Sequence, residues 1–168
     1  MAPSIRIIPA TEEHTEAVWE IFREVIAAGD AYVFEADTTR ETFLAYWFAA
    51  YASVAIEGEQ VLGSYIIKAN QPGRGSHVAN ASYMVASAAR GKGIGGLMCE
   101  HSLREAKALG FRSMQFNIVV STNLAAVALW QKHGFIIAGT LHGAFRHETF
   151  GYVDALVMFR DLADIGSL

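Results

Sequence analysis

A glycine-rich segment with two cations, VASAARGKGIGG at residues 85–96, holds the strongest chemical signal of this sequence. It joins a strand-like pattern to a helical one, so unpaired backbone N–H groups and the positive end of a helix dipole meet there. Glycine has no side chain that would keep an anion away from those N–H groups. Because Arg90 and Lys92 add positive charge, the segment predicts a phosphate-binding loop.

Two common phosphate-binding templates fit this loop poorly. The P-loop needs serine or threonine after Gly-Lys, where this chain has Gly93. The dinucleotide fingerprint GxGxxG matches Gly91, Gly93 and Gly96, but such a site also needs an acid near the end of the next strand. The next predicted strand, residues 112–120, contains no acid, which disfavours a dinucleotide site.

A third template is [RQ]xxGx[GA] between a strand and a helix, and Arg90, Gly93 and Gly95 match it. It is the acyl-coenzyme A loop of the GNAT N-acetyltransferases. A second signature of that family follows about 30 residues downstream, as NLAAVALWQKHGF at residues 123–135. Because both motifs occur in this order, the chain resembles a GNAT acetyltransferase over nearly its whole length.

The resemblance implies that acetyl-CoA binds to the glycine loop through its pyrophosphate. In the family, a backbone N–H of the preceding strand polarises the thioester carbonyl, which implies Met84 or Val85 here. Asn123 matches a residue that touches the pantetheine arm, and capping of the following helix is its alternative role. The residues implied for acetyl-CoA are Met84, Val85, Arg90, Gly91, Lys92, Gly93, Ile94, Gly95, Gly96, Asn123, Trp130 and Lys132.

One position departs from the family pattern. Many members place tyrosine where this chain has Trp130, and the tyrosine hydroxyl protonates the departing thiolate. An indole N–H is not released near neutral pH, so that role does not transfer to this chain. A thiol with a pKa of about 8.5 is a tolerable leaving group, and we expect solvent to supply its proton.

Polar residues within apolar strands mark a candidate acceptor site. Asn80 and Asn117 lie inside two predicted strands, where asparagine is disfavoured and a buried amide without partners costs about 1–3 kcal/mol. If the strands are neighbours, the two amides converge on a carboxylate or amide of the substrate; a satisfied hydrogen-bond pair in the core is the alternative. Glu35 is the leading candidate for the base, with pairing to a substrate ammonium or simple solvation as alternatives. The predicted catalytic residues are Glu35, Asn117 and Met84, and the predicted acceptor-binding residues are Tyr32, Phe34, Glu35, Asn80 and Asn117.

Within the GNAT family, the loop at residues 31–37 and the aromatic helix after it resemble acetyltransferases of small amino acids and analogues, such as the phosphinothricin type. A narrower likeness is to fungal azetidine-2-carboxylate acetyltransferases, whose substrate-site asparagines match Asn80, Asn117 and Asn123. The resemblance implies a small amino acid, imino acid or toxic analogue as the acceptor, and hence detoxification. Two alternatives are an acetyltransferase of proteins or peptides and a non-catalytic acyl-CoA-binding module.

The elements that must position these residues follow from apolar periodicity. Strands are expected at residues 4–8, 53–57, 60–69, 77–85, 112–120, 135–141 and 152–159, and helices at 11–28, 38–51, 93–109 and 122–133. This order is that of the GNAT fold, an α/β structure with a mixed, mostly antiparallel seven-stranded sheet and about four flanking helices.

Composition limits the remaining possibilities. A chain of 168 residues predicts one domain, residues 1–168, and a net charge of −4 without a basic run argues against nucleic-acid binding. The longest apolar stretch, residues 43–56, is too short to span a bilayer, so no membrane association is expected. The single cysteine, Cys99, suits a reducing cytoplasm, and the six histidines show no metal-site spacing. A homodimer is expected from the family resemblance.

Overall fold

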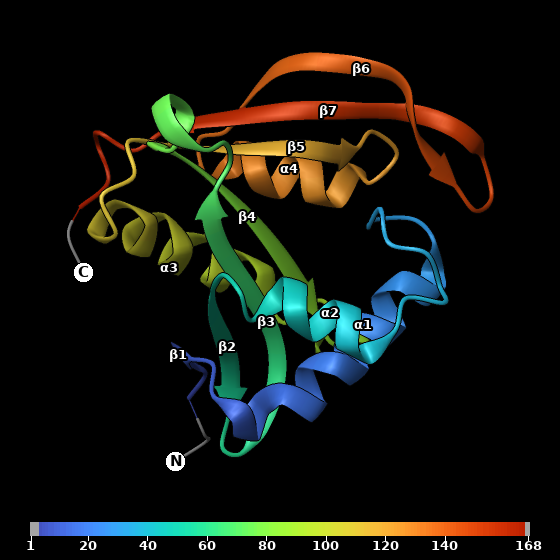
Figure 1. The fold of residues 1–168 in the computed structure, drawn as a ribbon, viewed down its shortest axis with the longest axis vertical. Coiled ribbons are helices and arrows are strands. Elements are labelled where there is room, and N and C mark those ends of the chain that lie inside the picture. The colour runs from blue at the N-terminus through green and yellow to red at the C-terminus, as the bar shows by residue number, and fades with distance from the viewer. Residues whose placement is uncertain (1–3, 167–168) are drawn as a thin grey trace.

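The structure, a computed structural model, describes residues 4–166, which form a sheet of strand order β1-β2-β3-β4-β5-β7-β6 (Figure 1). Its strands are β1 (Arg6–Pro9), β2 (Tyr51–Glu57), β3 (Gln60–Ala69), β4 (Val78–Val85), β5 (Ser113–Val120), β6 (Ile136–His147) and β7 (Gly151–Asp161). The helices are α1 (Thr15–Ala28), α2 (Arg40–Trp47), α3 (Ile94–Ala108) and α4 (Leu124–Lys132). The predicted fold class and element order are confirmed.

Several element boundaries differ from the predicted ones, and α2 and β6 illustrate why. Helix α2 is shorter than expected, because Thr39 caps it by accepting the Thr42 N–H at 3.2 Å and strand β2 begins as early as Tyr51. Strand β6 continues to His147, six residues beyond the expected end, since irregularities in its pairing with β7 let it bend without stopping. Among the described residues, no helix is both long enough and apolar enough to cross a membrane.

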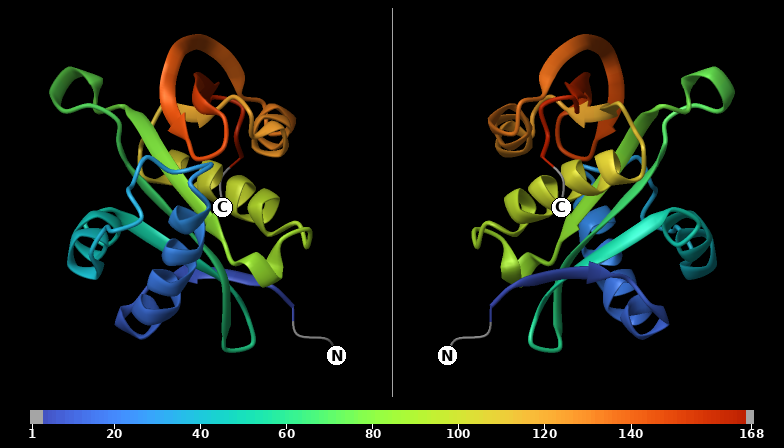
Figure 2. Two further views of the ribbon diagram at one scale, coloured as in Figure 1. Left: turned by 90° about the vertical axis from the view of Figure 1, so that its right-hand side faces the viewer. Right: turned by 90° about the vertical axis from the view of Figure 1, so that its left-hand side faces the viewer.

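Two apolar layers hold the sheet between the helices. Figures 1 and 2 show α1 and α2 on one face of the sheet and α3 on the other. Side chains alternate along β3, so Ile66 packs with α1 and α2, whereas Tyr65 and Ile67 pack with α3. The largest side chains of the first layer are Phe22, Phe43, Trp47, Ile66 and Met84, and those of the second include Tyr65, Ile67, Met98, Met114 and Phe116.

Strands β4 and β5 separate soon after they meet. They run parallel and pair at two positions, Val78 with Ser113 and Ala79 with Met114. Strand β4 stays paired with β3 along its whole length, so the separation opens a cleft on the β5 side of β4. Aromatic rings fill the base of this cleft, where the Trp130 ring lies 4.8 Å from that of Tyr83 and 4.9 Å from that of Phe116.

Two partly buried histidines, His101 and His133, are expected to make the free energy of unfolding depend on pH. His101 is half-buried, and its Nδ1 lies 2.7 Å from the Tyr65 hydroxyl. Burial lowers the pKa of His101 below its ordinary value, and it does the same for His133. The folded protein then binds fewer protons than the unfolded chain below pH about 6.5. The free energy of unfolding should therefore fall as the pH drops through about 6.5, and stop falling below the lowered pKa values.

Urea unfolding between pH 5 and 8 measures this dependence, with His101→Gln as the comparison. Glutamine still accepts a hydrogen bond from Tyr65 but does not titrate, so we expect a shallower dependence on pH, with the remainder due to His133. Identical pH profiles for the two proteins would show that His101 does not contribute.

Candidate active site

The glycine loop has the geometry of an anion site. A 3₁₀ turn, Ser87–Ala89, leads from β4 into the loop, and α3 begins at Ile94. Gly91 and Gly93 have φ values of 79° and 77°, a left-handed conformation that favours glycine. Among residues 4–166, no backbone acceptor pairs with the N–H groups of Gly91, Gly93 or residues 94–96. These groups fit the pyrophosphate of acetyl-CoA.

The side chains of the loop leave that site open. Arg90 and Lys92 are exposed, and neither forms an ion pair within the described part of the chain. A Cβ atom added at Gly91 or Gly93 would meet no atom within 4 Å. Ile94 is buried, so its contribution to an anion site is limited to its backbone N–H.

Gly95 and Gly96 have a second role that the sequence analysis missed. A Cβ atom at Gly95 would lie 3.2 Å from Leu129, and one at Gly96 would lie 3.6 Å from His133. Both neighbours belong to α4 or its C-terminal end. These glycines therefore let α3 approach α4 closely, which joins the two sequence motifs in space.

The β3–β4 register decides which backbone groups of β4 face the cleft. The Ala86 N–H donates to β3, and pairing alternates along an antiparallel ladder, so even-numbered residues of β4 pair with β3. Odd-numbered residues face the cleft, and the carbonyl of one of them, Tyr83, accepts the Tyr32 hydroxyl at 2.7 Å. Of the two positions implied for polarising the thioester, the register thus favours Val85, because the Met84 N–H belongs to the ladder.

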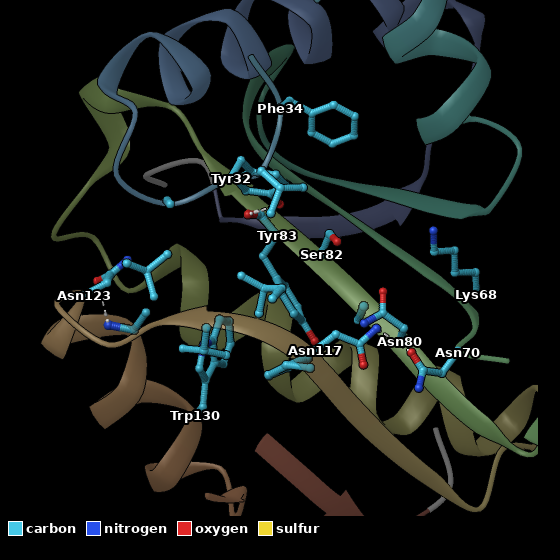
Figure 3. Close-up of a pocket in the computed structure, with 18 of the residues that line it drawn as sticks. Tyr32, Phe34, Lys68, Asn70, Asn80, Ser82, Tyr83, Asn117, Asn123 and Trp130 are labelled. Carbon is cyan, nitrogen blue, oxygen red and sulfur yellow. Dashed lines mark hydrogen bonds between the residues drawn. The ribbon is translucent and has the colours of Figure 1, made fainter. Parts of the chain in front are cut away.

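A cavity of about 390 Å³ lies at the cleft (Figure 3). It brings together six predicted residues from four separate segments of the chain: Tyr32, Phe34, Asn80, Asn117, Asn123 and Trp130. Sequence analysis missed its other large or polar residues, Tyr46, Lys68, Asn70, Ser82, Tyr83 and Phe116. The position of Asn80 could have indicated two of these residues. Ser82 lies two residues after Asn80 on the same face of β4, and Lys68 is the cross-strand partner of Asn80.

Asn80 and Asn117 belong to one hydrogen-bond network. Asn80 Nδ2 donates to the backbone carbonyl of Gln115 at 3.0 Å. The side chain of Gln115 donates in turn, from Nε2 to Asn117 Oδ1 at 2.9 Å. Asn117 Nδ2 donates to Asn70 Oδ1 at 2.7 Å. Asn80 and Asn117 are therefore linked through Gln115 and do not bond to each other. Both side chains nevertheless line the cavity.

Asn123 and Trp130 occupy the other end of the cavity (Figure 3). Asn123 Oδ1 accepts the Ala126 N–H at 3.1 Å, so this residue caps α4 while its side chain lines the cavity. Trp130 packs on Tyr83 at the cavity floor. Capping and lining are thus compatible roles for Asn123.

The tyrosine nearest Trp130 does not replace the missing acid. The Ser102 hydroxyl donates to the Cys99 carbonyl at 2.8 Å, so the Tyr83 hydroxyl donates to Ser102 Oγ at 2.6 Å. This bond directs the Tyr83 proton toward α3 and away from the cleft. Burial also raises the pKa of Tyr83 well above its ordinary value. Tyr83 therefore holds its proton outside the site.

Glu35 and Lys132 lie outside this cavity. Glu35 Oε1 lies 2.5 Å from Arg146 Nη2 of β6, with both side chains exposed, and it lines a neighbouring cavity between α1 and the β6–β7 hairpin. Lys132 lines a third cavity with Glu100 and Asp164. The structure thus separates Glu35 from Asn80 and Asn117. No carboxylate is among the described residues that line the cavity of about 390 Å³, which we call the acceptor cavity after its proposed role.

We expect Glu35→Gln to lower kcat by less than about threefold. An exposed carboxylate paired with Arg146 contributes little, and general-base catalysis by contrast supplies about 10²–10⁴-fold. Steady-state rates at saturating acetyl-CoA measure the effect. Arg146→Gln, which frees the carboxylate, is the matched variant. A fall of 100-fold or more in Glu35→Gln alone would identify Glu35 as the base after all.

Known proteins that are similar to this chain identify its family. A sequence model of the acetyltransferase (GNAT) family matches residues 12–135, well over half of the chain. The chain belongs to this family. A GCN5-related N-acetyltransferase from Kribbella flavida has 40% sequence identity and a TM-score of 0.90, with 94% of this chain and 97% of that chain covered.

Two further relatives extend the comparison for this GNAT enzyme. N-acetyltransferase aca1 of Schizosaccharomyces pombe is 41% identical over 100 residues, which are 58% of this chain and 47% of aca1, so the chain spans about half of that relative's length. A phosphinothricin acetyltransferase from Sinorhizobium meliloti, solved with AcCoA, has the same fold at 22% identity, with a TM-score of 0.83 and coverage of 96% and 89%.

Family membership makes this chain an acyltransferase with acetyl-CoA as its cosubstrate. Acetyl-CoA supplies the acetyl group as a thioester. The free N–H groups of the loop and the cations Arg90 and Lys92 fit its pyrophosphate, and the separated strands leave room for an extended arm beside Val85. Within residues 4–166, no group of three metal-ligating side chains could hold a metal ion.

Proposed function

We propose that this GNAT enzyme acetylates the amine of a small amino acid, imino acid or toxic analogue in the cytoplasm. The observation that carries this proposal is the acceptor cavity, which is small, about 390 Å³, and has aromatic and amide walls. Tyr32 anchors its outer wall to β4, because its hydroxyl donates to the Tyr83 carbonyl at 2.7 Å. The fold shared with a phosphinothricin acetyltransferase supports the same acceptor class.

The β6–β7 hairpin favours a small acceptor over a peptide. It bends toward the loop between α1 and α2 (Figure 1), where the Glu148 N–H donates to the Gly29 carbonyl at 3.1 Å. The pair between Glu35 and Arg146 adds a second link between hairpin and loop. A peptide acceptor needs an open groove, and these links restrict access from that side.

The proposed reaction uses few side chains. The ammonium of the acceptor first gives one proton to solvent, and the neutral amine nitrogen then forms a bond to the acetyl carbon. The bond to sulfur breaks with its electron pair on sulfur, and the nitrogen then loses a second proton. The Val85 N–H supports the carbonyl oxygen as negative charge develops there. Since no carboxylate lines the described cavity, the acceptor gives both protons to solvent, and the thiolate takes one from solvent.

An acetyl-CoA assay with a panel of acceptors, read by thiol release, tests the proposal. The panel contains free amino acids, proline analogues, methionine derivatives and short peptides with free N-termini or lysines. Release with free amino or imino acids supports the proposal. Release with peptides alone favours a protein or peptide acetyltransferase and overturns it.

We also propose a homodimer. Helix α4 and edge strand β6 keep large apolar side chains exposed, among them Leu124 at 74% and Ile136 at 64%. Burial of these side chains against a second copy would favour association. Sedimentation velocity across a range of protein concentrations tests it, and a monomer throughout that range would contradict it.

A further inference from the structure

The acceptor cavity has one cationic side chain and no anionic one among its described lining residues. The cation is Lys68, close to the end of β3. It is the cross-strand partner of Asn80, so both side chains leave the same face of the sheet. Figure 3 shows Lys68, Asn70, Asn80 and Asn117 together at one end of the cavity, with Trp130 and Asn123 at the other.

The Lys68 ammonium is positioned but has no anionic partner. Its Nζ lies 4.3 Å from the centre of the Tyr46 ring, which comes from α2 on the opposite wall. Within the part of the chain that the structure describes, Lys68 forms no ion pair. A ring face attracts the cation without neutralising it. The charge therefore stays available to an anion that enters the cavity.

The amides beside Lys68 are weaker ligands for an anion than the ammonium, although each NH₂ group has a second N–H beyond the one that already donates a hydrogen bond. Asn117 already accepts from Gln115 and donates to Asn70, and Asn80 donates to the Gln115 carbonyl. These bonds fix the amides, and an amide carries no net charge in any case. Bonds to a charged donor are markedly stronger than bonds between neutral groups, so a carboxylate in this cavity gains most from Lys68.

We propose that the Lys68 ammonium binds the carboxylate of the acceptor and selects free amino acids over amines that lack an acid group. This inference rests on the proposed function and assigns the carboxylate to Lys68, with Asn80 and Asn117 shaping the adjacent wall. A carboxylate at Lys68 leaves the remainder of a small acceptor on the side of Asn123 and Trp130, where the cleft lies.

The test compares an amino acid that the wild-type enzyme acetylates with the carboxamide of the same amino acid. The two acceptors share the amine and the side chain, but only the acid has a negative charge. Their amines differ in pKa, so the acid-to-amide ratio of kcat/KM is compared between enzymes, where that difference cancels. The enzymes are wild type, Lys68→Met, Lys68→Arg and Arg6→Met, which removes one positive charge from the edge strand β1.

We expect Lys68→Met to lower kcat/KM for the acid by about 10- to 100-fold, mainly by raising KM. The kcat/KM for the amide should change by less than about threefold. The KM for acetyl-CoA should stay the same. Lys68→Arg should restore most of the preference for the acid, and Arg6→Met should match wild type. Calorimetry in the presence of coenzyme A gives a second readout, in which the acid binds wild type and Arg6→Met but not Lys68→Met.

Two results would overturn the inference and leave the proposed function intact. One is an equal loss for acid and amide in Lys68→Met, which would indicate a merely structural role. The other is a Lys68→Met enzyme whose kcat/KM for the acid is the same as that of wild type, which would show that Lys68 does not bind the carboxylate. A wild-type enzyme that acetylates peptides but no free amino acid would overturn the proposed function and this inference together.

Discussion

Val85→Pro is expected to lower kcat/KM for acetyl-CoA by about 10²–10³-fold while the fold is retained. Proline lacks the N–H that faces the cleft, and we propose that this N–H supports the thioester carbonyl. The substitution removes no bond of the β3–β4 ladder, because the ladder uses the even-numbered residues of β4. The effect should therefore appear in catalysis and much less in stability.

Steady-state kinetics measure the loss, and circular dichroism with thermal unfolding verifies the fold. Val85→Ala separates the two parts of the residue, since it removes the side chain but keeps the N–H, and it should retain most of the rate. A Val85→Pro enzyme that is folded and nearly as active as wild type would show that this N–H does not support the reaction.

Gly93→Ala is expected to raise the dissociation constant of acetyl-CoA by about 10- to 100-fold. Gly93 has a φ of 77°, and an alanine in the left-handed region costs about 1–2 kcal/mol. A Cβ atom there would meet no neighbour within 4 Å, so the cost comes from the backbone and not from a clash. The loop relieves the strain by turning its N–H groups away from the pyrophosphate.

Isothermal titration calorimetry with acetyl-CoA gives the dissociation constants. Gly58→Ala is the matched control, because Gly58 has a φ of 61°, has open space around a Cβ atom and lies in the β2–β3 turn. Both variants should lose similar stability, but only Gly93→Ala should lose affinity. Equal dissociation constants of acetyl-CoA for the two variants would show that the glycine loop does not bind acetyl-CoA.

The geometry of the glycine loop was predictable because it is local in sequence. The glycine loop joins a strand to the helix that follows it directly, and its N–H groups are unpaired because they lie at a helix start. Asn123 is similarly local, as a helix cap that acts on the N–H three residues later. Family membership followed from the same local motifs and is confirmed by the match over residues 12–135.

The acceptor site depended on contacts that local patterns do not encode. Glu35 was a reasonable base by type and position, but Arg146, 111 residues away in the chain, pairs with it outside the acceptor cavity. No sequence motif singles out Lys68. It became a candidate carboxylate ligand because the register places it opposite Asn80 and because α2 brings Tyr46 within 4.3 Å.

The sequence by itself therefore determined the family, the element order and the glycine loop before α3, all of which follow from residues close together in the chain. The tertiary structure alone decided which N–H groups of β4 face the cleft and which side chains share the cavity. The physical reason is that a shift of one residue in register reverses the direction of every backbone and side-chain group in a strand. In β4 that register directs the Val85 N–H toward the cleft and the Met84 N–H into the β3–β4 ladder, and in β3 it places Lys68 opposite Asn80.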